Sequence, residues 1–247
     1  MCYNIAFLTR RLQIYADRYK DTLPPAFSTT LQADHYLPQY HFVSGFEHPK
    51  LPVITENEIL FCHWGLIPHW IKDETAAQDI RTRTLNAAGE TLFEKPSFRK
   101  SIASKRCLLG INGFYEWRLF NKTKYPYFIQ PRDKGILSLG CLYDTWTNHE
   151  TGEIVHTFSV VTTPANPMME TIHNTKKRMP LIISIENEGR WVSPALNAGD
   201  VMNMVKPCAD DMLEAYTVSM AANHVRNDRN TPQILQKVEY PELTLFG

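Results

Sequence analysis

Seven short runs rich in apolar residues recur along the chain, and they constrain its fold more than any other feature. The runs are VITENEILFCHWGL, RCLLGINGFYEWRLF, YPYFIQP, GILSLGCLYDTWT, EIVHTFSVVTT, RMPLIIS and EAYTVSM. Their β-branched and aromatic residues, bounded by Gly, Pro and Asn, are typical of strands. Residues 147–153 have the composition of a hairpin loop between two such strands. Residues 38–52, rich in His and Pro, favour extended chain and turns.

Helical spacing is rarer. Residues 10–20 carry apolar side chains at the spacing of one helix face, and Pro24 follows to end a helix there. Further helices are expected over residues 88–100, 186–198 and 208–215, with Pro96 and Pro194 interrupting the first two. The sequence therefore predicts an α+β fold. We expect a single compact, strand-rich domain over residues 1–247, with an antiparallel, barrel-like sheet and peripheral helices.

Charge and composition narrow the classes of function. With 26 basic and 26 acidic residues the net charge is zero, so nucleic-acid binding would have to use local patches. Two stretches qualify, although either could be a solvated face: residues 81–106, rich in Lys and Arg, and residues 176–178. No apolar run approaches the ~20 residues that span a bilayer, so we expect a cytoplasmic protein without membrane contact.

Cysteine usage points away from disulfides and metal. The chain has five cysteines, widely spaced and without a CxxC pair. Cys62, His63 and His69 resemble a zinc site, but no second ligand pair lies at metal spacing. We therefore expect neither metal nor cofactor.

The second residue is a cysteine. Removal of Met1 would leave Cys2 with a free α-amine and a thiol, a 1,2-aminothiol that condenses with aldehydes to a thiazolidine ring. The two groups titrate near ~8 and ~8.5, so a neutral amine and a thiolate are both accessible near neutral pH with modest tuning. The alternative is an inert residue at a frayed terminus.

Three further side chains are chemically capable. Glu116 lies between Tyr115 and Trp117, whose rings would desolvate the carboxylate. Desolvation raises the pKa of a carboxyl group toward neutral pH, where it can act as a general acid or base. His173 precedes a basic run and could relay protons. Asn86 could present its amide to a substrate or to the N-terminal backbone. Each also has a structural interpretation: a solvent-facing strand glutamate, a capping histidine, a turn asparagine.

The segment HWGLIPHW concentrates large rings. Aromatic side chains of this kind stack on unpaired bases or fill a core. We expect Trp64 to lie in the core and Trp70 on the surface.

Taken together, these segments resemble the SOS-response-associated peptidase family, whose members process abasic sites by crosslinking to damaged single-stranded DNA. The shared motifs run in order along nearly the whole chain: MC, HWGLIPHW, TLNAAGET, RCLLGINGFYEW, YPYFI, VVTTPAN, and IH followed by RMPLII. The resemblance implies a nucleophile at Cys2, with Asn86, Glu116 and His173 completing the site. It also implies covalent capture of the ring-opened abasic sugar by Cys2. We expect a monomer that associates with the nucleoid when bound to DNA.

Two departures from the family pattern concern DNA contact. The family usually carries an arginine where this chain has Asn4, and another where it has Ala88. Losing two phosphate-binding charges would weaken backbone affinity. The side chains expected to contact DNA are Trp70, Arg81, Arg83, Thr162, Lys176, Lys177 and Arg178. The spacer between His173 and Arg178 is also longer than in many relatives, by about one turn.

Two other functions remain open from sequence. The first is a cysteine peptidase, in its mildest form one that removes its own Met1, with Cys2 as nucleophile and His173 as base. The second is a non-enzymatic module that binds nucleic acid or protein through the HWGLIPHW aromatics and does not need Cys2.

Overall fold

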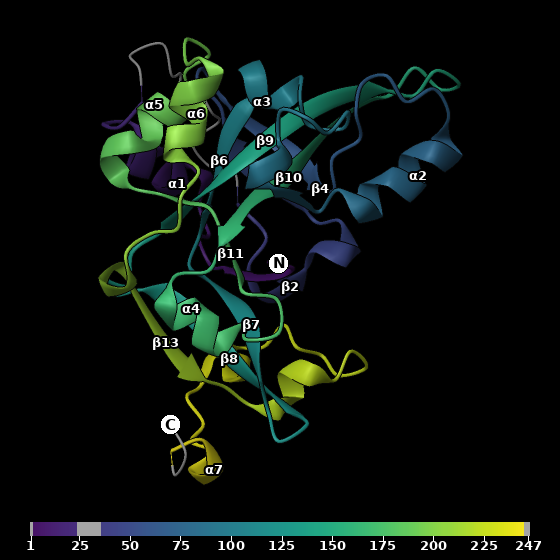
Figure 1. The fold of residues 1–247 in the computed structure, drawn as a ribbon. Helices are drawn as coiled ribbons and strands as arrows, with labels where there is room; N and C mark the ends of the chain where they lie inside the picture. Colours follow the sequence, from purple (N-terminus) through teal and green to yellow (C-terminus); the bar gives the residue numbers. More distant parts are fainter. Residues whose placement is uncertain (1, 24–35, 245–247) are drawn as a thin grey trace.

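A closed barrel forms the upper half of the molecule in the computed structural model, which describes residues 2–23 and 36–244 (Figure 1). Its strands are β3 (Lys50–Ile54), β4 (Ile59–Trp64), β6 (Arg106–Ile111), β9 (Leu137–Thr147) and β10 (Ile154–Pro164). In the order β10-β4-β3-β6-β9 each strand pairs with the next, and β9 pairs again with β10. The ring of strands therefore closes, which confirms the barrel-like sheet.

Short strands extend the barrel at its edges. These are β5 (Asn86–Ala88), β11 (Arg178–Pro180) and β12 (Ile182–Ile183). Most pairings in this sheet are antiparallel, as expected, and β10 in addition runs parallel to both β4 and β5. Each of these parallel partners is separated from β10 by a long stretch of chain, which gives the room that a parallel crossover needs.

A second, antiparallel sheet lies below the barrel in Figure 1. Its order is β13-β8-β7-β1-β2. The strands are β1 (Asn4–Phe7), β2 (Tyr40–Ser44), β7 (Gly113–Phe120), β8 (Thr123–Pro131) and β13 (Leu213–Thr217). Because β1 lies between β2 and β7, the chain enters the fold through the middle of a sheet.

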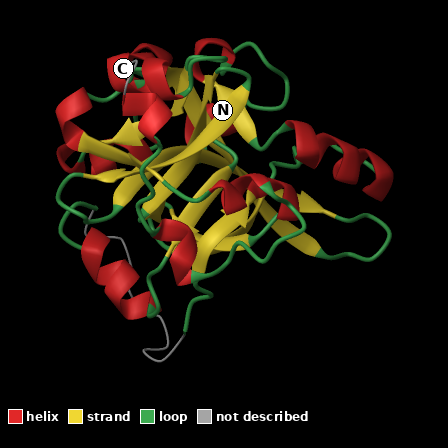
Figure 2. Cartoon of the chain, turned by 90° about the horizontal axis from the view of Figure 1, so that it is seen from below, coloured by secondary structure: helices red, strands yellow, loops and turns green. Residues whose placement is uncertain are grey.

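Helices lie at the periphery of the strands, as expected for this α+β class (Figure 2). They are α1 (Leu12–Tyr19), α2 (Glu74–Arg83), α3 (Ser101–Ser104), α4 (Pro167–Ile172), α5 (Glu188–Val192), α6 (Ala198–Met204) and α7 (Pro241–Thr244). Short 3-10 turns are η1 (Gly45–Glu47), η2 (Gly89–Thr91), η3 (Ile185–Asn187), η4 (Asp210–Met212), η5 (Met220–Asn223) and η6 (Pro232–Leu235). No helix in the described ranges is long and apolar enough to cross a membrane.

Some helix predictions hold and others are wrong. The prediction over residues 10–20 is confirmed by α1, whose buried face includes Tyr15 and Tyr19. Residues 88–100 contain a 3-10 turn and tight turns rather than a helix. Residues 186–198 contain the end of η3 and the short α5, and α6 begins only at Ala198. The expected helix at 208–215 is wrong, because Leu213 begins β13, which pairs with β8. The hairpin loop at residues 147–153 is confirmed between β9 and β10.

Candidate active site

Cys2 lies just ahead of β1 and is fully buried in the main core. The register of β1 against β7 pairs Asn4 with Tyr115, which brings the start of the chain alongside Glu116. Burial raises the pKa of the Cys2 thiol, and the Glu116 carboxylate raises it further. We expected a thiolate to be accessible with modest tuning, whereas burial here favours the thiol form of Cys2.

Glu116 and His173 form a buried pair beside Cys2. The distance from Glu116 Oε2 to His173 Nε2 is 3.6 Å, and the side chains are 5% and 9% exposed. Burial raises the pKa of Glu116 to about 8 and lowers that of His173 to about 4. Burial thus favours a neutral pair, in which the carboxyl holds a proton and the imidazole does not.

The backbone fixes which nitrogen of His173 faces the glutamate. His173 follows α4, and its Nδ1 lies 2.8 Å from the carbonyl oxygen of Arg178. A carbonyl oxygen only accepts hydrogen bonds, so Nδ1 must carry the proton and donate it. In the neutral ring Nε2 is then an acceptor, and it points to the Glu116 carboxyl. The pair can pass one proton between them.

Asn86 carries an unsatisfied buried amide. It begins β5 and pairs with Val160 of β10, which in turn pairs with Cys141 of β9. Neither Oδ1 nor Nδ2 of Asn86 has a hydrogen-bond partner among the described residues, although both atoms are buried. A buried amide without partners costs about 1–3 kcal/mol. Asn86 is not among the residues that line the cavity at Glu116 and His173, which is described next.

A cavity of about 510 Å³ opens onto the Glu116–His173 pair. It is lined by Tyr3, Glu116, Trp117, Leu119, Lys124, His173, Thr175, Lys176, Ala222, Asn223, Val225 and Arg229. Sequence reasoning missed its C-terminal wall, residues 222–229, because no local motif marks that segment. The wall is tied to the site by Asn223, which accepts from Trp117 Nε1 at 2.5 Å and donates to the Lys124 carbonyl at 2.9 Å.

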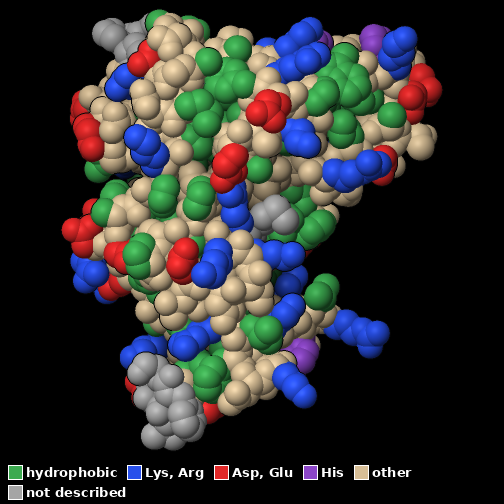
Figure 3. All heavy atoms as spheres, in the orientation of Figure 1, with side chains coloured by type: hydrophobic (Ala, Val, Ile, Leu, Met, Phe, Trp, Pro, Cys, Tyr) green, Lys and Arg blue, Asp and Glu red, His purple; other side chains and the backbone are tan. Residues whose placement is uncertain are grey.

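The residues expected to contact DNA differ in their availability. Lys176 lines the cavity, and Trp70 is 46% exposed while Trp64 is fully buried, as expected. Lys177 lies 3.7 Å from Glu170, and Arg83 is paired with Asp79. Figure 3 shows Lys and Arg side chains spread over this face of the molecule, with Asp and Glu side chains among them.

Thr162 and Arg178, both expected to contact DNA, bond to each other within the protein. Thr162 is 1% exposed, and its carbonyl and hydroxyl oxygens accept from Arg178 Nη2 at 2.7 and 3.1 Å. The guanidinium of Arg178 also pairs with Glu90. Arg81 is different: burial lowers its pKa, and its buried Nε has no partner among the described residues. Of the cations expected to contact DNA, Arg81 and Lys176 are thus the ones without an ion pair among the described residues.

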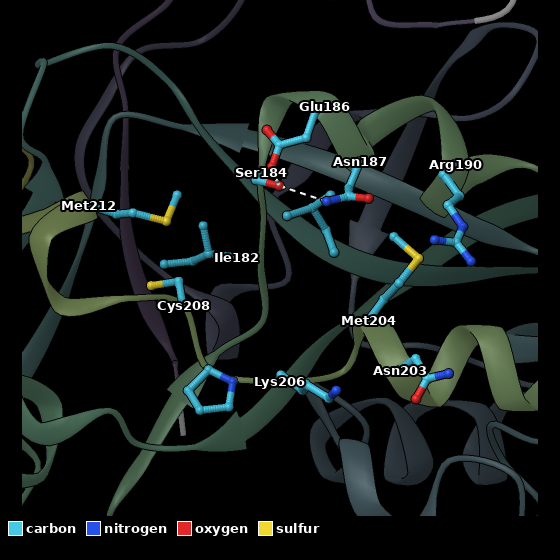
Figure 4. Close-up of a pocket in the computed structure, with 12 residues that line it drawn as sticks. Ile182, Ser184, Glu186, Asn187, Arg190, Asn203, Met204, Lys206, Cys208 and Met212 are labelled. Atoms are coloured by element: carbon cyan, nitrogen blue, oxygen red, sulfur yellow. Dashed lines mark hydrogen bonds between the residues drawn. The ribbon is translucent and has the colours of Figure 1, made fainter.

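Another cavity, of about 370 Å³, contains none of the predicted site residues (Figure 4). Ile182, Met204 and Met212 form its apolar side, and Arg190 at its rim is paired with Asp200. In the described part of the chain, no three His, Cys, Asp or Glu side chains gather as metal ligands.

Comparison with known proteins identifies the family of this chain. A family model described as SOS response associated peptidase matches residues 1–225. "Abasic site processing protein YoqW" of Bacillus subtilis is 37% identical over 217 residues, covering 82% of this chain and 90% of that protein. "Abasic site processing protein HMCES" of Gallus gallus is 27% identical over 206 residues, covering 75% of this chain and 59% of that protein.

The fold is shared as well. A crystal structure of a protein from Bacteroides thetaiotaomicron matches with a TM-score of 0.85 and 35% identity, covering 96% of this chain and all of that one. Sequence motifs, fold and relatives agree, and the chain belongs to the SOS response associated peptidase family.

Proposed function

We propose that this protein processes abasic sites in single-stranded DNA by forming a thiazolidine between Cys2, freed of Met1, and the ring-opened sugar. The observation that carries the proposal is the buried Glu116–His173 pair beside the Cys2 thiol. Two curated relatives bear the name abasic site processing protein, which supports the same class of substrate.

The chemistry follows from the protonation states. The α-amine of Cys2 attacks the aldehyde carbon C1′ and forms a carbinolamine, which loses water to give an imine. The thiol sulfur then adds to the imine carbon, and its proton passes to the nitrogen. The ring closes with one water released overall. Since the thiol is held protonated, the amine reacts first.

Each neighbouring group has a role in this sequence. Glu116, with a pKa raised to about 8, donates a proton to the departing water and accepts one during ring closure. His173 Nε2 exchanges that proton with Glu116 and assists sugar opening. The free amide of Asn86 binds the backbone of the N-terminal residue. Lys176 and Arg81 bind DNA phosphates, and Trp70 stacks on an unpaired base.

The test is covalent capture of an oligonucleotide that carries one abasic site. Protein with Met1 removal verified by intact mass should form a heat-stable adduct of summed mass less one water. Cys2→Ala should form none, whereas Cys208→Ala, which alters a thiol outside the site, should react like wild type. Absence of adduct in the wild type would falsify the proposal.

The same protein separates the two alternative functions. An autopeptidase would release Met1 in a host without methionine aminopeptidase, and Cys2→Ser or Glu116→Gln would retain it. A non-enzymatic module would bind intact and abasic strands equally and would tolerate Cys2→Ala. We expect strong preference for the abasic strand.

A further inference from the structure

A second polar cavity lies on the barrel, away from the Cys2 site. It has a volume of about 450 Å³ and is lined by His69, Arg99, Lys100, Ser101, Ala103, Ser104, Lys105 and Asp144. These residues come from the loop after β4, the segment around α3, and β9. The proposed chemistry at Cys2 uses none of them.

The buried carboxylate of Asp144 holds two of the lining side chains, Lys105 and His69, in place. Asp144 is 2% exposed, and both of its oxygens are occupied. Oδ1 accepts from Lys105 Nζ at 2.5 Å and from the Thr145 backbone at 2.9 Å. Oδ2 accepts from the backbone and Nδ1 of His69, each at 2.9 Å. Both oxygens of Asp144 are therefore occupied by donors, and the ion pair with Lys105 offsets its negative charge.

Asp144 also sets the direction of the imidazole. Since a carboxylate accepts, His69 Nδ1 carries the proton, and Nε2 lies on the ring edge away from Asp144. The His69 side chain is 39% exposed and lines the cavity. Burial alone would raise the pKa of Asp144, but the bonds from Lys105 and His69 outweigh burial and hold that pKa below its usual value. The carboxylate thus stays charged and keeps both partners in place.

Two exposed cations lie at the rim of this cavity, on a turn that is anchored in the core. Arg99 and Lys100 are exposed, and neither has an ion pair with any residue in the described ranges. Between them and the core, Phe98 and Ile102 are buried one turn apart, and the Ile102 amide bonds to the Phe98 carbonyl at 2.8 Å. The two cations therefore project from an anchored turn. The cavity thus combines two cations without an ion pair in the described ranges, Arg99 and Lys100, with the ion pair of Lys105 and Asp144.

Not all of the basic run serves this cavity. Arg106 is 1% exposed and donates to the carbonyls of Ile102, Ala103 and Trp191. Its guanidinium is therefore not available to a ligand in the cavity. Arg99 and Lys100 remain for a ligand, and Lys105, although paired with Asp144, has further N–H groups to donate. A concave surface with Arg and Lys donors, hydroxyls and a fixed imidazole acceptor suits a phosphate that bears one proton.

We propose that this cavity binds a phosphate group, either a free phosphate or the terminal phosphate of a DNA strand. Arg99, Lys100 and Lys105 donate to its oxygens, and the P–OH donates to His69 Nε2. The site is independent of covalent capture by Cys2.

Inorganic phosphate is the first probe. The His69 Cε1–H NMR resonance, assigned with His69→Gln, should shift saturably with phosphate and not with chloride at equal ionic strength. Removing two charge-assisted contacts in Arg99→Gln/Lys100→Gln should weaken phosphate binding at least about tenfold. The matched control Lys72→Gln/Lys95→Gln removes the same charge from exposed residues outside the cavity and should bind as wild type.

Oligonucleotides with and without a 5′-phosphate distinguish the sources. A preference for the phosphorylated strand that Arg99→Gln/Lys100→Gln abolishes assigns the site to strand ends. A phosphate-dependent shift without that preference assigns it to free phosphate. The proposal is overturned if phosphate gives no saturable shift, or if both double variants bind it equally.

Discussion

At the scale of single residues, the Glu116–His173 pair couples protonation to stability. Unfolded Glu and His titrate near ~4.3 and ~6.5, whereas the folded pKa values are about 8 and about 4. Unfolded His173 binds a proton that the folded ring rejects, so its contribution to stability rises between pH ~4 and ~6.5. Folded Glu116 keeps a proton that the unfolded carboxyl releases, so its contribution falls as pH rises toward 8.

The contributions of His173 and Glu116 to the free energy of unfolding change in opposite directions below pH ~6.5. Above that pH only the contribution of Glu116 still changes. We expect the free energy of unfolding to fall by about 1–2 kcal/mol between pH ~6.5 and ~8. Glu116→Gln, which keeps the shape and cannot titrate, should remove that fall. Urea unfolding of both proteins across this pH range measures it, and a parallel decline in the variant would show that another group is responsible.

The burial of Glu116 was predicted from the sequence, but for the wrong reason. Glu116 is 4% exposed, yet its chain neighbours Tyr115 and Trp117 pack in a separate cluster, because successive side chains of a strand point to opposite faces. The state of the Cys2 thiol was not predictable, because it depends on burial in a core built from distant strands. Lys124 and Arg229 also escaped prediction, since the cavity they line joins β8 to the C-terminal wall only after folding.

At the scale of elements, α4 positions His173. Its N-cap, Asn166, is 4% exposed, accepts from the Met169 amide at 2.9 Å and donates to the Cys208 carbonyl at 3.2 Å. Asn166→Ala should cost about 1–2 kcal/mol of stability and slow adduct formation, because the last turn of α4 carries the histidine.

A matched cap exists elsewhere in the fold. Asn197 caps α6 in the same way, accepting from the Asp200 amide at 3.0 Å, and it does not line the Cys2 cavity. Asn197→Ala should lose stability and leave the adduct rate unchanged. Thermal melts with single-turnover crosslinking compare the two, and equal rates for both variants would remove the positioning role of α4.

The local sequence pattern predicted whether a segment is a helix or a strand, except where pairing with a distant strand overrode that pattern. The apolar spacing in residues 10–20 was sufficient to predict α1. Residues 208–215 have a plausible helical pattern, but Leu213 and Ala215 pair with Pro131 and Ile129 of β8. That pairing comes from a strand some eighty residues earlier, which no local window contains. The helix α2 was missed because only Ala77 on it is buried, so it has almost no apolar face.

At the scale of the whole molecule, Arg106 joins the barrel to its peripheral helices. Besides the α3 carbonyls, it donates to the carbonyls of Trp191 and Ser193 at the end of α5. Arg106→Ala would leave those carbonyls unsatisfied around a void, and we expect a loss of about 3–5 kcal/mol. Lys95→Ala, an exposed charge in the same run, should change stability by less than about 0.5 kcal/mol. Calorimetry of both variants tests this, and a small loss for Arg106→Ala would contradict it.

The place of β1 in the lower sheet has a practical consequence for anyone who alters this protein. Because β1 is flanked on both sides and Cys2 is fully buried, any sequence added ahead of Cys2 begins inside the packed protein. The last helix, α7, instead lies at the far end of the molecule (Figure 1). Affinity handles, fluorescent fusions and partner domains therefore belong after α7, and libraries that vary the first residues will sample the interior of the fold.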